Sequence, residues 1–77
     1  MTPDTFCAAI RRELTTSLAA DEAWMRGATG LCDMYAAATP ERFESILEQT
    51  ARGANGSALA EGARWLLARW RAAVRSA

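Results

Sequence analysis

Few side chains in this sequence are suited to catalysis. Its 77 residues include no histidine and no lysine, so the usual general base, the Schiff-base amine and the imidazole metal ligand are all missing. Catalysis would have to depend on carboxylates, hydroxyls or the two thiols. We therefore predict that the protein is not an enzyme.

Three glutamates, Glu41, Glu44 and Glu48, are spaced to share one side of a helix. Carboxylates in such a row would suit a metal ion or acid–base chemistry, but the Glu-x-x-His partner of carboxylate-bridged bundles is missing. Arg52 follows Glu48 by four residues, the spacing of a helical ion pair. We interpret the row as a solvated helix face with one ion pair, and we predict neither a metal site nor a cofactor.

The two cysteines, Cys7 and Cys32, have no metal-ligand spacing and form no CxxC motif. Each falls on an apolar stripe, as expected of a buried free thiol that packs as a small hydrophobic residue. If the first two helices form an antiparallel hairpin that turns near Ala20, the cysteines lie at almost the same height. A disulfide then stays open as an alternative, provided that the Cα atoms approach within about 7 Å. A nucleophilic role is not expected, because neither thiol has a histidine to activate it.

The length of the chain allows a single domain, residues 1–77, with a modest core. Dimerisation is an alternative way to complete such a core. The N-terminus has no basic region followed by an apolar stretch, and no apolar run approaches the length needed to span a membrane. We expect a cytoplasmic protein.

Capping patterns and apolar spacing predict an all-α fold, a compact bundle of four short helices. Thr2-Pro3-Asp4 and Thr39-Pro40-Glu41 each combine a capping hydroxyl, a first-turn proline and an acid, which is a helix-start pattern. Apolar residues recur every three or four positions, and no stretch alternates as a strand would. The predicted helices cover roughly residues 3–18, 21–38, 40–52 and 58–75.

Two glycines, Gly27 and Gly30, interrupt the second predicted helix. Each costs roughly 1 kcal/mol relative to alanine in a helix. They indicate either a close crossing with another helix or a locally weak or kinked helix. The sequence does not favour one interpretation over the other.

The last helix has more surface chemistry than packing requires. Its expected core face consists of Leu59, Ala63, Leu66, Leu67, Trp70, Ala73 and Val74. Trp65 points about 140° away from the centre of that face, beside small alanines. Arg64, Arg71 and Arg75 form a basic strip along the helix. Trp65 is therefore an interface anchor, a residue that packs under another part of the chain, or an exposed tryptophan with no role.

Charge is also unevenly distributed, although the formal net charge is zero. Residues 1–48 contain eight acids and four arginines, whereas residues 49–77 contain Glu61 and five arginines. Tryptophan and arginine are enriched at interface hot spots. We therefore expect a non-enzymatic protein–protein interaction module, an adaptor or a small inhibitor such as phages and mobile elements encode. The expected partner-binding residues are Trp65, Arg64, Arg69, Arg71 and Arg75.

Two other partners compete with a protein. The C-terminal arginines suit nucleic-acid phosphates, but a helix-turn-helix mode is disfavoured because the third helix would present three glutamates to the phosphates. Tryptophan and arginine on an amphipathic helix also suit a membrane surface, although the apolar face is already needed for the core. We rank nucleic acid second and membrane association third.

Overall fold

The two helices that begin with proline are capped in the same way. In the computed structural model, which describes residues 1–16 and 22–76, Thr2 precedes α1 (Pro3–Thr15) and Thr39 precedes α3 (Pro40–Ala51). Each threonine hydroxyl accepts a hydrogen bond from the backbone N–H three residues later, at 3.2 Å in α1 and 3.3 Å in α3. This bond satisfies a donor that the first helical turn leaves unpaired. Both predicted helix starts are confirmed.

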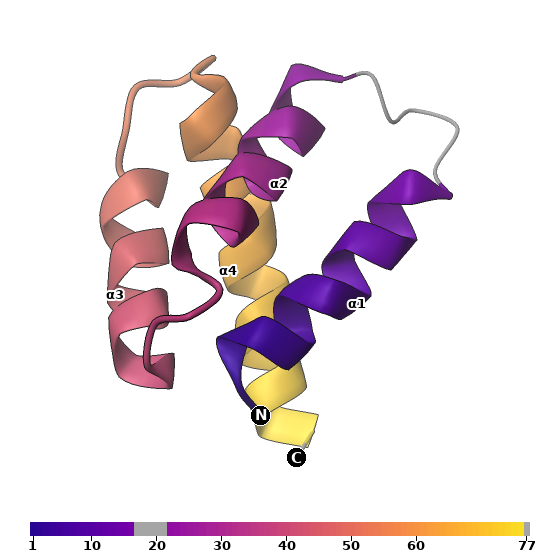
Figure 1. The fold of residues 1–77 in the computed structure, drawn as a ribbon. Helices are drawn as coiled ribbons and strands as arrows, with labels where there is room; N and C mark the ends of the chain where they lie inside the picture. Colours follow the sequence, from indigo (N-terminus) through magenta and orange to yellow (C-terminus); the bar gives the residue numbers. More distant parts are fainter. Residues whose placement is uncertain (17–21, 77) are drawn as a thin grey trace.

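The other two helices are α2 (Ala23–Tyr35) and α4 (Ala58–Ser76). Ser57 caps α4, its hydroxyl accepting the Ala60 N–H at 3.3 Å as predicted. In the part of the chain that the structure describes there are four α-helices and no strand (Figure 1), so the all-α prediction is confirmed.

Helix α1 ends at Thr15, before the predicted end at residue 18. The hydroxyls of Thr15 and Thr16 donate to backbone carbonyls of the last turn, which is the competition expected of short hydroxyl side chains. The predicted packing of Leu18 and the turn near Ala20 lie outside the described residues.

The core combines buried side chains from all four helices. Its centre is a trio of aromatic rings from α1, α3 and α4, namely Phe6, Phe43 and Trp70. In each of the three pairs the ring centroids are 5.1 to 5.9 Å apart. The rings pack edge to face, the arrangement that aromatic quadrupoles favour. Phe6 thereby attaches α1 to both α3 and α4.

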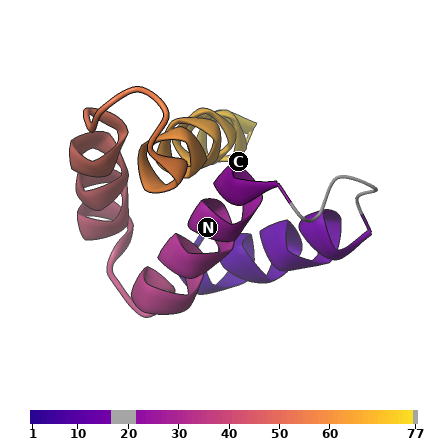
Figure 2. The same cartoon turned by 90° about the horizontal axis from the view of Figure 1, so that it is seen from above.

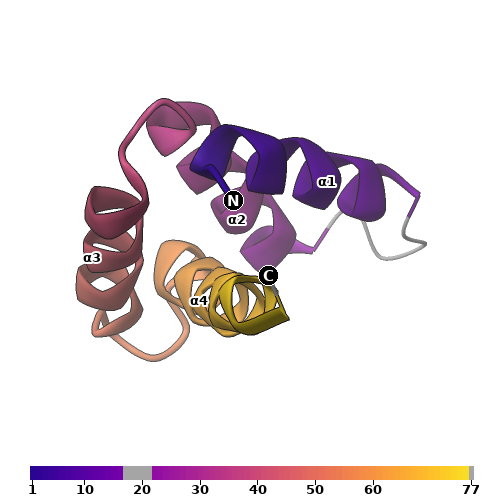
Figure 3. The same cartoon turned by 90° about the horizontal axis from the view of Figure 1, so that it is seen from below.

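Helix α2 lies between α1 and α4, and α3 lies beside α4 (Figures 2 and 3). Helices α2 and α4 cross with their backbones close together. A Cβ atom built on Gly27 would lie 2.3 Å from the Ala58 carbonyl oxygen, and one on Gly62 would lie 2.5 Å from the Ala28 nitrogen. The close-crossing interpretation is confirmed for Gly27. It is wrong for Gly30, where a Cβ would meet nothing within 4 Å.

Two residues predicted for the core face of α4 are exposed instead. Leu59 retains 46% of its accessible surface and Val74 47%. At Leu59 it is the backbone, not the side chain, that approaches α2. Val74 lies near the C-terminal end of α4. This helix has 19 residues, whereas α2 has 13 residues and α3 has 12 residues.

Candidate interaction surface on helix α4

The side of α4 that faces away from α2 presents an exposed row of arginines and alanines, called the outer strip below. Its spacing of three or four residues keeps these side chains on one side of the helix. The outer strip consists of Arg64, Ala68, Arg71, Ala72 and Arg75, all of them exposed. The small alanines leave the middle of the strip low, so that a partner can approach the helix backbone between the arginines.

The three arginines of the outer strip differ in their contacts. Arg64 donates to the Gly53 carbonyl oxygen at 2.9 Å, and Arg75 donates to the Arg71 carbonyl oxygen at 3.3 Å. Arg71 instead forms an ion pair with Glu48 of α3 at 2.6 Å. Within the described residues, no carboxylate lies within ion-pair distance of Arg64 or Arg75. These two side chains therefore keep their positive charges available to a ligand.

The Glu48 contact corrects an expectation from the sequence. Glu48 pairs with Arg71 across the α3–α4 contact rather than with Arg52 on its own helix. Helical spacing makes the Arg52 pair available, but it cannot reveal a competing arginine that tertiary packing brings closer. Among the described residues, no group of three or more histidine, cysteine or acidic side chains could hold a metal ion.

Arg69 and Trp65 belong to a different part of the surface. Arg69 forms an ion pair with Glu13 of α1, and its guanidinium lies over the Trp65 ring, 5.0 Å from the centroid. The structure thus separates Arg69 from the other α4 arginines, with which it was grouped as a binding residue.

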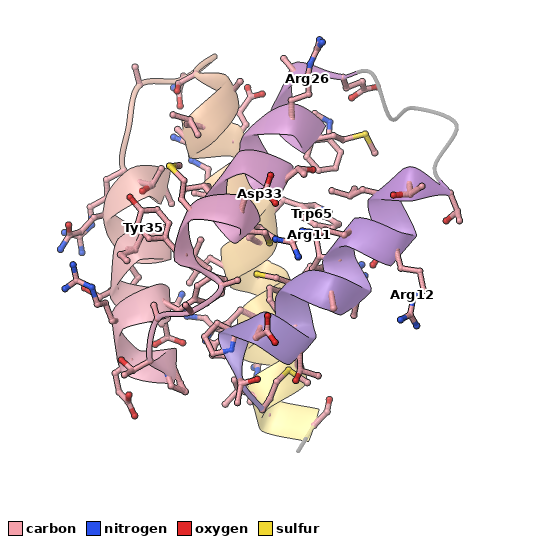
Figure 4. The ribbon with its side chains drawn as sticks, in the orientation of Figure 1. Arg11, Arg12, Arg26, Asp33, Tyr35 and Trp65 are labelled. Atoms are coloured by element: carbon pink, nitrogen blue, oxygen red, sulfur yellow. The ribbon has the colours of Figure 1, made fainter. Side chains whose placement is uncertain are left out.

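Trp65 is half-buried and packs against the core. Its ring centroid is 5.2 Å from that of Trp24 in α2, and the side chain points from α4 toward the side where α1 and α2 meet (Figure 4). Of the interpretations of Trp65, contact with another part of the chain is therefore present. Trp65 lies three residues before Ala68 on the same helix. Its exposed part therefore borders the outer strip.

The residues that contact Trp65 and Arg69 could not be predicted from the sequence. Glu13 and Trp24 come from α1 and α2, far from α4 in the chain. Periodicity assigns a residue to a face of its own helix, but it does not specify which distant residue lies opposite.

The two cysteines lie away from the outer strip. Cys7 of α1 and Cys32 of α2 are fully buried members of the core, and both are free thiols. The predicted state, a buried thiol that packs as a small apolar residue, is confirmed.

The comparisons with known proteins give no family. No protein-family model, no curated protein and no solved structure matches this chain. None of the described helices is both long enough and apolar enough to cross a membrane.

Proposed function

We propose that this protein is a non-enzymatic interaction module that binds an acidic surface of a protein partner through the outer strip of α4. The observation that carries the proposal is the pair Arg64 and Arg75, whose charges are exposed and matched by no carboxylate of the described residues. An acidic partner would supply the missing carboxylates. Arginine suits this task because its planar guanidinium binds a carboxylate through two parallel hydrogen bonds.

The remaining predicted binding residues have supporting roles in this proposal. Arg71 and Arg69 are shared with Glu48 and Glu13, so each would contact a partner only by loosening an exposed ion pair that is worth at most about 1 kcal/mol. Trp65 would add apolar contact through its exposed edge, held in place by Trp24 and Arg69. A tryptophan that is already ordered loses little entropy on binding.

A module of this kind acts by covering a site on its partner or by joining two partners. We propose an adaptor or a small inhibitor, acting in the cytoplasm, where reducing conditions keep thiols such as Cys7 and Cys32 free. The competing partners are a nucleic acid, an anionic membrane and a second copy of the chain.

The direct experiment places a photo-crosslinking amino acid at Ala68, in the middle of the outer strip, and expresses the full chain in its native host. The matched control places the same group at Ala9, an exposed alanine on α1. We expect one crosslinked protein from position 68 and none from position 9. Crosslinks to nucleic acid, to lipid or to a second copy from position 68, or equal yields from both positions, would overturn the proposal.

The crosslinked protein is then purified and its binding is measured directly. Replacing both Arg64 and Arg75 by glutamate should weaken binding at least tenfold. Arg42→Glu, which reverses an exposed arginine on α3, should leave it unchanged. The affinity should fall only modestly between low and moderate salt, whereas phosphate binding by several arginines falls steeply. Equal effects of the two charge reversals would contradict the proposed surface.

A further inference from the structure

The cysteines of α1 and α2 are juxtaposed at the contact between these helices. Cys7 and Cys32 are both 0% exposed. Arg11, one helical turn after Cys7, forms a 2.8 Å ion pair with Asp33, the residue after Cys32. Figure 4 shows Arg11 and Asp33 pointing toward each other from the two helices. The ion pair therefore marks a level at which α1 and α2 are in contact close to both thiols.

The two thiols are electrostatically different. The pKa of Cys7 is lowered, chiefly by hydrogen bonding with Cys32 and further by the positive charge of Arg11, against the opposing effect of burial. The pKa of Cys32 is raised by the same hydrogen bond and by burial. The surroundings favour the same order, because the guanidinium of Arg11 lies one helical turn from Cys7, whereas the carboxylate of Asp33 directly follows Cys32.

An open hollow of about 440 Å³ lies between α1 and α2 beside the Arg11–Asp33 ion pair, and neither cysteine is among its lining residues. Its lining includes Leu14, Met25 and Gly30, and it also includes Arg11 and Asp33 themselves. Gly30 contributes no side chain there, which leaves the hollow open beside it. A small polar molecule in the hollow would contact the guanidinium of Arg11, one turn from Cys7.

We propose that Cys7 and Cys32 are a redox-active dithiol, which a small hydroperoxide such as hydrogen peroxide oxidises to a disulfide that joins α1 to α2. This inference is independent of the proposed binding function of α4. It assigns Cys7 a nucleophilic role, which the sequence did not lead us to expect, and it gives the hollow a ligand class, a hydroperoxide held beside Arg11. Because both sulfurs are buried and neither cysteine lines the hollow, the reaction requires local opening of the α1–α2 contact.

The reaction has two steps. The Cys7 thiolate attacks one peroxide oxygen, the O–O bond breaks, and the hydroxide that leaves takes a proton to become water, so that Cys7 becomes a sulfenic acid. The sulfur of Cys32 then attacks the sulfenic sulfur. The S–S bond forms as hydroxide leaves and takes the Cys32 proton, giving a second water. Two thiols are oxidised to one disulfide, and one hydrogen peroxide is reduced to two waters.

The disulfide would change how firmly α1 is held. In the reduced protein α1 is attached through side-chain packing and exposed ion pairs. A bond between residues 7 and 32 closes a loop of the chain and restricts the unfolded state, which stabilises the folded one. Disulfides in reducing compartments are typically transient and redox-sensing, the role that a buried, reversible pair would fill.

The test uses the full chain, reduced and then exposed to hydrogen peroxide under native conditions. We expect the intact mass to fall by two hydrogen atoms, both thiols to become resistant to alkylation, the protein to remain at its starting oligomeric size, and dithiothreitol to restore all of these properties. The thermal midpoint should rise on oxidation. Disulfide-linked dimers, overoxidation of a single cysteine, or an unchanged mass would overturn the inference.

Two sets of variants keep the inference testable. Cys32→Ala should accumulate a sulfenic acid on Cys7 that a dimedone probe traps, whereas Cys7→Ala should react with the peroxide far more slowly. Arg11→Gln should slow disulfide formation several-fold relative to Arg12→Gln, its exposed neighbour, which points away from the α1–α2 contact (Figure 4). The two arginine variants retain both cysteines. Their rates of disulfide formation can therefore be measured even if a cysteine variant fails to fold. Equal rates for the Arg11 and Arg12 variants would exclude the proposed approach of the peroxide.

Discussion

Helix α4 is attached to α2, and helix α1 to the rest of the molecule, in opposite ways. At the α2–α4 crossing the two backbones meet, because Gly27 and Gly62 leave no side chain between them. At α1 the attachment consists of side chains, with Phe6 in the core and the ion pairs Arg11–Asp33 and Glu13–Arg69 at the surface. A backbone crossing fixes the helices at one distance, whereas side-chain contacts allow adjustment.

The difference gives the molecule two parts. Helices α2, α3 and α4 form a body that presents the outer strip of α4 in a fixed geometry. Helix α1 is fastened to that body at Phe6 and at the buried thiols. We expect α1 to open first when the protein is destabilised, since its surface contacts are exposed to solvent.

The largest expected effect is on the attachment of α1. Phe6→Ala removes the ring that contacts both Phe43 and Trp70, and should lower the free energy of unfolding by about 3–5 kcal/mol. In native-state hydrogen exchange, the amides of α1 should lose protection before those of α2 and α4. Simultaneous loss in all four helices would show that α1 and the body unfold as one unit.

The second effect concerns the backbone crossing. Gly27→Ala or Gly62→Ala places a methyl group within 2.5 Å of backbone atoms of the facing helix. Forcing the helices apart should cost about 2–3 kcal/mol, measured by urea unfolding.

Gly30→Ala is the matched control, because it lies in the same helix and its Cβ would meet nothing within 4 Å. It should stabilise the protein by about 1 kcal/mol, the difference in helix propensity. Destabilisation by Gly30→Ala similar to that of Gly27→Ala would contradict the close crossing.

These glycines also show where sequence reasoning ends. Helix starts at Thr2 and Thr39 were predicted correctly because a cap depends on three or four adjacent residues. The roles of Gly27 and Gly30 were not separable, since both interrupt the same helix and only the position of α4 distinguishes them. Gly62 was missed for the same reason.

The candidate surface was predictable to a similar extent. The periodicity of α4 correctly set the exposed arginines apart from Leu66 and Trp70. It could not show that Arg69 pairs with Glu13 or that Arg71 pairs with Glu48, because these acids come from other helices. Which arginines keep an unmatched charge is thus a property of the tertiary structure.

A smaller effect is expected at the helix caps. Thr2→Ala and Thr39→Ala each remove a hydroxyl that accepts a first-turn N–H, and each should cost about 1 kcal/mol. The energies should be similar, but the consequences should differ between the two parts of the molecule. Thr2→Ala should speed hydrogen exchange in α1 alone, whereas Thr39→Ala should lower protection throughout the body. The same exchange pattern for both variants would argue against a separable α1.

The smallest effects are expected at the exposed ion pairs. Arg11 and Asp33 retain 41% and 61% of their side-chain exposure, so solvent screens their attraction. A double-mutant cycle with Arg11→Gln and Asp33→Asn should give a coupling energy below about 1 kcal/mol that falls as salt is added. The Glu48–Arg71 pair between α3 and α4, with 38% and 48% exposure, is the matched control within the body. Similar coupling in the two cycles would show that exposed ion pairs are equally weak in both parts of the molecule. The attachment of α1 would then depend on its core contacts, Phe6 and the buried thiols. A coupling for Arg11–Asp33 several times that of the control would instead assign the ion pair a leading part in holding α1, and opening of α1 would then depend strongly on ionic strength.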